Sequence, residues 1–268
     1  MDPTTSGRFR VHDRRPRPDI EEDSDVADGV DAAPDASDEF VLVELPDGRI
    51  DPTAPDAEDQ FDPLYATAEG YEDEIAERVA SLEPGYVVDA TLAWTDASAR
   101  FVDVEVVRES RFRFADDVEG MFEAAVETWD QIRAEGEAVG SITTRSNDGE
   151  PNGALYLFAD APGGDAFVDL RAGRLPIEPL VARVNESRDD DGPREVFVLR
   201  PAAHDFVAVY VVFDRDGVLA QTVRDTYDLG PGLAAGLEAG EFEAAKADDE
   251  DSGDDTDDGD DFDALDRL

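Results

Sequence analysis

Residues 82–107 read LEPGYVVDATLAWTDASARFVDVEVV, and this stretch decides the fold class of the first half of the chain. Apolar residues recur at every second position over 88–94, which is typical of a strand with one buried face. The small polar residues at 95–98 predict a turn, and the alternation resumes over 101–107. The stretch therefore predicts two strands, the second of which returns beside the first.

Elements nearer the N-terminus extend this pair of strands. The pattern of apolar residues predicts a short strand at 8–11, a buried strand at 40–45 and a weak strand near 49–50. Residues 71–82 carry apolar side chains at helical spacing, and a Pro-Gly pair follows them as a stop signal. The order strand, strand, weak strand, helix, strand, strand predicts a small five-stranded β-barrel of the OB type or a related type.

The second half of the chain predicts a layer of helices and strands. Asp116 or Asp117 can cap a long helix whose apolar residues form one stripe: Val118, Met121, Phe122, Ala125, Trp129 and Ile132. A second helix is predicted over 176–187, where Pro176 suits the first turn. Strands are predicted at 141–146, 154–160, 166–171, 196–199, 206–213 and 218–223. The resulting order, α-βββ-α-βββ, predicts an α+β unit rather than an alternating parallel sheet.

Composition divides the chain into five segments. Changes in charge and apolar content predict a strand and arginine-rich arm at 1–18, a disordered acidic linker at 19–38, a β-rich N-terminal unit at 39–110, an α+β unit at 111–230 and an acidic, mostly disordered tail at 231–268. The fold class predicted for the whole is α+β.

The choice of charged residues is very unequal. The 268 residues include 69 Asp plus Glu against 23 Lys plus Arg, a net charge of -46, and 22 of the 23 cations are arginine. A carboxylate-rich surface favours solubility, and a Debye length of about 3 Å at 1 M salt screens its self-repulsion. The composition therefore predicts a halophilic, cytoplasmic protein whose acidity describes the solvent rather than a substrate. We expect the acidic tail to hold a diffuse shell of cations.

Missing residues exclude several functional classes. Without cysteine there is no disulfide framework, cysteine nucleophile or thiolate metal site. His12 and His204 stand alone, and no serine-elbow, zinc-protease or phosphate-loop motif occurs. The glycine-rich stretch at 230–232 lacks dinucleotide-loop spacing, and the abundance of carboxylates marks no acid–base pair. No run of about 20 apolar residues occurs either. The sequence predicts no catalytic residue, metal site, cofactor or membrane partner.

Two segments are candidates for binding. The first interleaves arginines with aromatic side chains, as single-strand nucleic-acid binders do, and comprises Arg8, Phe9, Arg10, Arg14, Arg15, Arg17, Arg111 and Arg113. The same alternation also describes a half-buried strand with a cationic exposed face. The second candidate is the end of the tail, where apolar residues that could dock on a partner recur every three positions: Phe262, Leu265 and Leu268. A solubilising tail with a frayed end is the alternative there.

Five segments resemble an uncharacterised protein family of haloarchaea. They are TSGRFRV at 5–11, LEPGYVVDATLAW at 82–94, GMFEAAVETW at 120–129, NGALYLFA at 152–159 and VRDTYD at 223–228. The resemblance implies a haloarchaeal cytoplasm and no activity, so it assigns no functional residue. The order of helices and strands in the second half is also similar to that of YbjN-like and secretion-chaperone-like proteins, which bind other proteins. That likeness concerns fold, and fold alone does not give function.

The sequence favours a non-enzymatic module that binds, or acts as an adaptor for, an unknown protein partner. One alternative is a nucleic-acid-associated factor that uses the arginine arm and a barrel face. Barrel geometry with Arg8, Arg10, Arg111 and Arg113 on one face would favour it. The other alternative is a metal-dependent hydrolase, which a closed pocket with converging buried carboxylates would favour.

Overall fold

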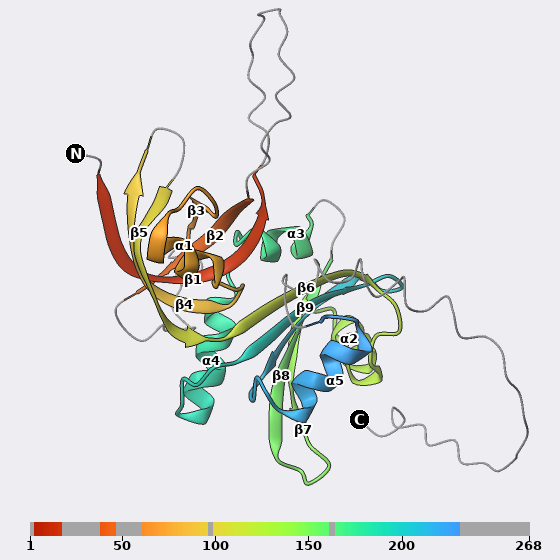
Figure 1. Cartoon of the computed structure of the whole chain (residues 1–268). Coiled ribbons are helices and arrows are strands. Elements are labelled where there is room, and N and C mark those ends of the chain that lie inside the picture. The colour runs from red at the N-terminus through yellow and green to blue at the C-terminus, as the bar shows by residue number, and fades with distance from the viewer. Residues whose placement is uncertain (1–2, 18–37, 47–60, 96–98, 161–163, 231–268) are drawn as a thin grey trace, which may run out of the picture.

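Two sheets organise the molecule (Figure 1). The computed structural model describes residues 3–17, 38–46, 61–95, 99–160 and 164–230, and its mixture of helices and sheets confirms the α+β class. The predicted weak strand near 49–50, most of the predicted linker and the predicted tail lie outside the described residues. None of the described helices is long and apolar enough to cross a membrane.

The first sheet closes into a barrel with the strand order β1-β2-β3-β5-β4. Its elements are β1 (Thr4–Pro16), β2 (Asp38–Leu45), β3 (Pro63–Thr67), α1 (Asp73–Ala80), β4 (Tyr86–Trp94) and β5 (Ala99–Glu109). Paired strands are antiparallel except β3 and β5, which pair in parallel at Ala66 and Ala99. This barrel confirms the OB-like or related type predicted from the sequence. Strand β3 was not predicted, because the sequence indicated the weak strand near 49–50 as the third strand of the barrel.

Alternation along the strands fills the barrel. Inward-facing side chains such as Phe9 and Val11 of β1 and Leu92 of β4 are completely buried. Helix α1 contributes Val79 to the same core, and Leu82 follows from the turn after it. The interior is therefore an apolar core packed with side chains, as small barrels require.

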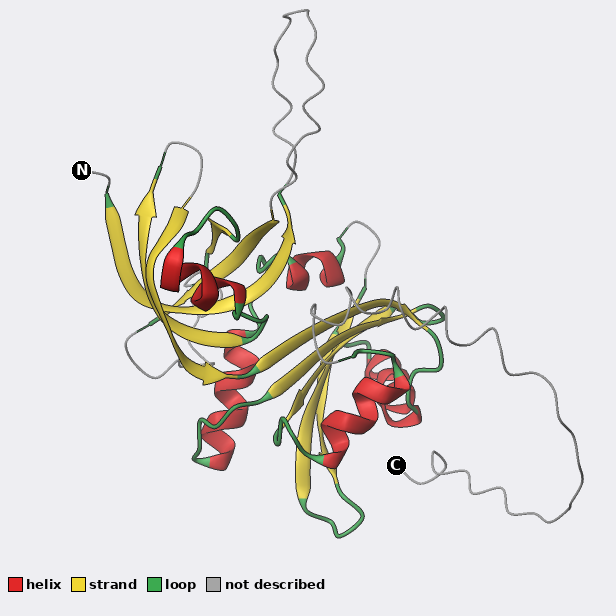
Figure 2. Cartoon of the chain, viewed as in Figure 1, coloured by secondary structure: helices red, strands yellow, loops and turns green. Residues whose placement is uncertain are grey.

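The second sheet has the strand order β6-β9-β10-β8-β7 and carries helices on both faces (Figure 2). Its elements are β6 (Arg111–Val118), α2 (Glu123–Glu135), β7 (Val139–Arg145), β8 (Pro151–Ala159), α3 (Ala166–Arg171), α4 (Glu178–Arg188), β9 (Glu195–Pro201), β10 (Phe206–Val212) and α5 (Val218–Thr226). Helices α2 and α5 pack on one face, whereas α3 and α4 pack on the other. Because both faces are covered, every residue of β10 is buried, which explains its uninterrupted apolar sequence.

Two segments predicted as strands are helices. Residues 166–171 form α3, where the Asp165 side chain caps the first turn by accepting a hydrogen bond from the Val168 amide at 2.9 Å. Residues 218–226 form α5, whose Ala220 and Val223 are buried three positions apart. The predicted α-βββ-α-βββ order was wrong at both places, because the apolar and β-branched residues suggested strands while their burial follows a helical period.

The long helix begins later than predicted. Val118 is the last residue of β6, and positive φ angles at Asp117 (56°) and Gly120 (65°) turn the chain before α2 begins at Glu123. Asp116 and Asp117 therefore do not cap it. The predicted apolar stripe still packs against a single core, although its first residue reaches that core from a strand.

Candidate functional site

The arginine and phenylalanine candidates of β1 lie on opposite sides of the strand. Phe9 is completely buried in the barrel core, so it offers solvent no stacking surface. Arg8 points out of the barrel and donates two hydrogen bonds to Asp89 of β4, at 2.7 and 2.8 Å. Arg10 is on the same side but is only 3 % exposed, because it contacts Glu178 of α4. The alternation thus gives a half-buried strand, one of the two interpretations of the sequence.

Arg14 and Arg15 lie near the C-terminal end of β1, and Arg17 follows that strand. Arg14 donates to Asp38 at 2.8 Å and Arg15 donates to Glu39 at 3.0 Å, which ties both side chains to the start of β2. Arg17 is the last residue of that segment and is half-buried. These contacts place Arg14 and Arg15 in cross-strand ion pairs rather than on an open cationic face.

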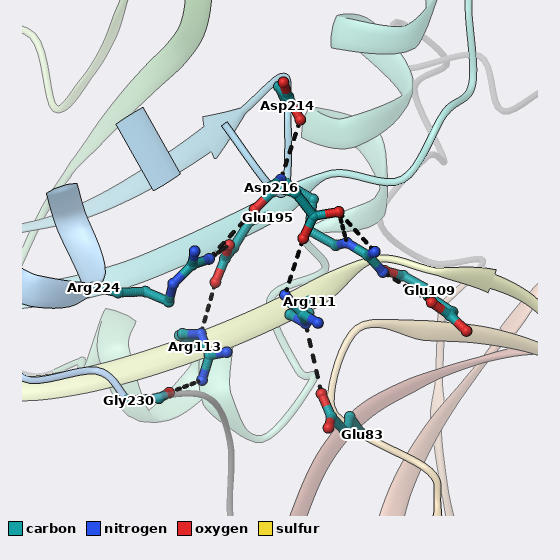
Figure 3. A network of polar contacts seen from close by, with 10 residues as sticks. Glu83, Glu109, Arg111, Arg113, Glu195, Asp214, Asp216, Arg224 and Gly230 are labelled. Atoms are coloured by element: carbon teal, nitrogen blue, oxygen red, sulfur yellow. Dashed lines mark hydrogen bonds and ion pairs between the residues drawn. The ribbon is translucent and has the colours of Figure 1, made fainter. Parts of the chain in front are cut away.

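Arg113 belongs to a buried ionic cluster on the second sheet (Figure 3). It donates to Glu195 of β9 at 2.7 Å, and Arg224 of α5 donates to the other oxygen of the same carboxylate. Glu195 is completely buried, so its charge depends on these two guanidinium groups. Arg113 also donates to the Gly230 carbonyl at 2.6 Å. The cluster therefore holds Gly230 against β6.

Arg111 lies beside this cluster, at the junction of the two units. Its guanidinium is 3.4 Å from Asp216, in the turn before α5, and 3.7 Å from Glu83, in the segment before β4. A nucleic-acid face would need Arg8, Arg10, Arg111 and Arg113 on one surface, but they lie on two. Arg8 and Arg10 of β1 face α4, whereas Arg111 and Arg113 face α5 and the turn before it.

A buried ion pair holds the barrel against α4. Nε of Arg10 lies 3.2 Å from Oε1 of Glu178, and both side chains are almost inaccessible. Nη1 of Arg10 donates to the Gly85 carbonyl at 2.9 Å, and the guanidinium lies 4.9 Å from the centroid of the Phe112 ring. Burial lowers the pKa of the Arg10 guanidinium, whereas the Glu178 carboxylate raises it. Within the described residues neither Glu178 oxygen accepts a hydrogen bond, so the attraction of the pair must offset most of its desolvation.

His12 and Asp13 extend this junction to α3. His12 follows the inward-facing Val11 and so faces out of the barrel, at a bulge of β1 between Val11 and Asp13. Nε2 of His12 donates to the Leu170 carbonyl at 2.6 Å, because a carbonyl can only accept. Asp13 accepts a hydrogen bond from Arg171 at 3.0 Å. His12 is thus a hydrogen-bond donor between the two units.

A polar cleft of about 470 Å³ lies above the Arg10–Glu178 pair, between the barrel and α4. Arg8 and Arg108 lie along it together with Asn185 and the acidic residues that follow α4. Arg8 is paired with Asp89 and Arg108 is paired with Asp191. Opposite charges therefore meet along the cleft, and no region of one sign distinguishes it as an anion or cation site.

An apolar cavity of about 450 Å³ lies on the opposite side of the second sheet, between α2 and α5. Its floor is formed by β7, β8 and β10, and its walls come from the start of α2 and one side of α5. The apolar and aromatic residues that line it are Met121, Phe122, Ala124, Ile142, Tyr210, Leu219, Val223 and Tyr227. A volume of this size is within the range of ligand-binding pockets, and a largely apolar lining is typical of them.

The floor of this cavity carries three polar side chains that bond to one another. Tyr210 donates to Oγ1 of Thr144 at 2.8 Å, and Thr144 donates to Oδ1 of Asn152 at 2.8 Å. Burial raises the pKa of Tyr210 to about 12, so its hydroxyl stays neutral. Gly153 makes the arrangement sterically feasible, because a Cβ there would lie 2.6 Å from the Tyr210 ring and 2.8 Å from Thr144.

The walls of the cavity are held together at the end of α5. The hydroxyl of Tyr227 accepts a hydrogen bond from the Phe122 amide at 3.2 Å and contacts the Met121 sulfur at 3.7 Å. The charged residues that line the cavity are Glu123 and Arg145. Arg145 donates to the Gly149 carbonyl at 2.8 Å and has no carboxylate partner within the described residues.

Many carboxylates of the described residues are partners for arginines. Arg200 illustrates this, since its hydrogen bond holds the pKa of Asp116 below the usual range. The pKa of Asp165 is also low, chiefly because of the Val168 amide and then because of Arg200. No group of three or more His, Asp or Glu side chains in the described ranges is close enough to hold a metal ion. His204 lies in the turn between β9 and β10, with its ring 5.7 Å from that of Phe206.

Sequence reasoning did not find the apolar cavity. Met121 and Phe122 were recognised as apolar positions of a helix, but α5 was predicted as a strand, so the second wall was missing. No local motif marks Thr144, Asn152 and Tyr210, which come from three different strands. The other predicted docking residues, Phe262, Leu265 and Leu268, lie outside the described residues.

These features define a class of two-unit α+β protein. A closed barrel is joined by a buried ion pair to a unit whose sheet has helices on both faces and an apolar cavity beneath two of them. The model of a family of unknown function, DUF6663, matches residues 1–235, and the chain belongs to this family. The match confirms the resemblance to an uncharacterised family. Searches of curated proteins and of solved structures each found no match.

Proposed function

We propose that the protein is a non-enzymatic binding module whose cavity between α2 and α5 receives an apolar segment of a partner protein. The observation that carries the proposal is the cavity itself: about 450 Å³ bounded by two helices and lined mainly by apolar and aromatic side chains. Two helices on one face of a sheet can form the kind of groove that amphipathic helices occupy in other proteins. An adaptor function follows from such a groove without any chemical step.

The polar groups of the cavity support binding rather than catalysis. Tyr210 remains neutral far above physiological pH, so it donates a hydrogen bond instead of removing a proton. The hydroxyl of Thr144 is engaged by both of its neighbours. Because both hydroxyl protons are used within the cavity floor, an apolar segment can pack against these groups without leaving either proton unpaired.

The environment that we propose for this function is the salt-rich cytoplasm of a haloarchaeon. Support comes from the ratio of 69 acidic to 23 basic residues and from the single lysine. Strong screening in such salt removes most long-range attraction between charges. Apolar burial keeps its strength under the same conditions, which favours an apolar docking site.

Nucleic-acid binding by the arginine candidates is the less supported alternative. A nucleic acid would have to displace carboxylates from Arg8, Arg14 and Arg15, and phosphate contacts weaken steeply as salt rises. A metal-dependent hydrolase has similarly little support, because the described carboxylates do not converge on a common point. Fluorescence anisotropy with labelled single-stranded DNA and RNA at rising KCl tests the first alternative, and we expect no saturable binding.

The test of the proposed function fills the cavity with a side chain. Ala124 lines the cavity and Ala182 lines the cleft above Arg10, and the two hollows have similar volumes, about 450 and 470 Å³. Ala124→Trp should abolish capture of a specific partner from lysate in 3 M KCl and should weaken binding of the apolar dye anilinonaphthalene sulfonate at least tenfold. Ala182→Trp is the matched control and should change neither. Equal dye binding by the two variants would contradict the proposal.

A further inference from the structure

We infer that the apolar end of the chain, Phe262, Leu265 and Leu268, is a built-in occupant of the cavity between α2 and α5. The inference rests on the proposed function, because it takes the cavity to be a docking site for an apolar segment. It names the segment that docks when no partner is bound. A partner must then displace part of the same chain, so the tail sets the threshold for partner binding.

The chain leaves α5 beside the cavity. Arg113 holds the carbonyl of Gly230, and Tyr227, three residues earlier, already lines the cavity. Helix α5, which forms one wall of the cavity, has nine residues and is about 14 Å long. The whole of this wall therefore lies within about 14 Å of the C-terminal end of α5. The 32 residues from Gly230 to Phe262 can span up to about 110 Å, so their length does not prevent docking.

The apolar residues at the end of the tail match the apolar lining of the cavity. Phe262, Leu265 and Leu268 recur every three residues, a spacing that would bring the three side chains to one side of a docked helix. The residues between them are acidic or small, apart from Arg267, so apolar contacts are confined to that side. The cavity offers a matching apolar surface on α2, β7 and α5. Burial of these three side chains removes apolar surface from water, and this favours docking.

The charges of the cavity lining and of the tail are complementary. Arg145 lines the cavity and lacks a carboxylate partner among residues 3–17, 38–46, 61–95, 99–160 and 164–230. Asp263 and Asp266 flank the apolar residues of the tail and can supply that carboxylate. Covalent attachment adds a further advantage, because it gives the tail an effective concentration on the order of millimolar.

The composition of the chain allows a direct test on the full-length protein. The only methionines are Met1 and Met121, so protein labelled with ¹³C-methyl methionine gives one signal from the cavity wall and one internal control. The chain has no cysteine, so Arg267→Cys accepts a single nitroxide spin label at the end of the tail. In 3 M KCl the spin label should reduce the Met121 signal at least fivefold and leave the Met1 signal largely intact.

Matched variants separate the apolar end from the rest of the tail. Phe262→Ser, Leu265→Ser and Leu268→Ser together should restore the Met121 signal in the spin-labelled protein. Leu233→Ser, Leu237→Ser and Phe242→Ser, which remove the same residue types elsewhere in the tail, should leave it bleached. A free peptide of residues 256–268 should shift the Met121 signal of the first variant. Bleaching that is equal in the two variants, or that disappears on tenfold dilution with unlabelled protein, would overturn the inference.

The same signal distinguishes this inference from the proposed function. If the spin label leaves Met121 unchanged but anilinonaphthalene sulfonate shifts its signal, the cavity binds apolar ligands and the tail is not its occupant. If neither the spin label, the peptide nor the dye affects Met121, both proposals fail.

Discussion

The Arg10–Glu178 pair joins the two units through charges that have almost no access to water. Desolvation of such a pair costs several kcal/mol, and few hydrogen bonds offset that cost here. Removal of one partner leaves the other as an isolated buried charge, whereas removal of both leaves an apolar contact between β1 and α4. A single substitution should therefore lower the stability of the protein more than substitution of both residues by apolar ones.

We expect Glu178→Ala to lower the free energy of unfolding by about 3–5 kcal/mol, because Arg10 remains buried without its counter-charge. The double substitution Arg10→Met with Glu178→Leu should recover most of that loss. Glu186→Ala, on the exposed side of the same helix, should change stability by no more than about 0.5 kcal/mol. Denaturant unfolding in 2 M KCl measures all three. A double variant that is no more stable than Glu178→Ala would show that the pair is not coupled.

The raised pKa of Tyr210 predicts that the folded protein loses stability in strong alkali. Its pKa is raised by burial to about 12 in the folded state, against about 10 when unfolded. Between these values the folded protein keeps the proton and the unfolded chain loses it, so stability is complete below pH 10 and declines as the pH rises towards 12. The contribution is on the order of 2–3 kcal/mol.

The measurement compares wild type with Tyr210→Phe. Unfolding by denaturant from pH 9 to pH 12 should show a smaller decline for the variant, and absorbance titration should show the loss of a tyrosine that ionises last. Identical slopes would mean that Tyr210 does not hold its proton in the folded state.

Residue roles were only partly accessible from the sequence. Alternation predicted correctly that Phe9 and Arg10 lie on opposite faces of a strand. The sequence did not reveal that α4 covers Arg10, because Glu178 is 168 positions away and its charge resembles 68 other acidic side chains. Partners of buried charges depend on tertiary contacts, and a composition so rich in carboxylates hides them.

At the scale of elements, Gly85 controls how the barrel meets β6. Its φ of +100° is unfavourable for other residues, and a Cβ there would lie 2.5 Å from the backbone of Arg111. The Phe112 amide donates to the Pro84 carbonyl at 2.8 Å, so the two segments are held together and cannot separate freely. A side chain at this position therefore meets backbone that has no room to move.

Gly85→Ala should lower the free energy of unfolding by at least about 2 kcal/mol more than Gly149→Ala. Gly149 has a similar φ of +82°, but a methyl group added there would meet nothing within 4 Å, so it isolates the cost of backbone strain, about 1–2 kcal/mol. The excess at Gly85 comes from steric overlap. Parallel denaturant melts of the two variants provide the comparison, and equal losses would show that the junction adapts to a methyl group.

Elements were predicted best where one pattern dominated. The strands β4, β5, β9 and β10 and the helix α4 follow from alternation, from apolar runs and from apolar residues at helical spacing. The proline in the first turn of α4 is Pro179 rather than the predicted Pro176, because the helix begins at Glu178. The segments at 166–171 and 218–223 were misassigned because each is short and rich in apolar residues, so strand and helix patterns fit almost equally. The capping interaction of Asp165 and the burial of Ala220 distinguish them, and both depend on the folded arrangement.

At the scale of the whole molecule, the net charge predicts how salt affects the stability of the fold. The net charge of -46 means that each acidic residue without a nearby arginine adds to repulsion within the folded state. At 0.1 M salt this repulsion acts over about 10 Å, and at 1 M it acts over about 3 Å. The buried pairs Arg10–Glu178 and Arg113–Glu195 are screened far less, so salt acts mainly on the surface.

We therefore expect the melting temperature to rise by roughly 10 °C or more between 0.2 and 3 M KCl. Relief of repulsion worth several kcal/mol gives this size of change, because each kcal/mol shifts the melting temperature of a protein of this length by about 2–4 °C. Most of the rise should occur below 1 M, where the Debye length shortens most. Stronger apolar burial would also stabilise the fold, and sucrose isolates that effect because it is excluded from protein surfaces without screening charge. A calorimetric series in KCl and in sucrose of equal osmolality measures both. A sucrose series that reproduced the KCl series would assign the stabilisation to burial instead of screening.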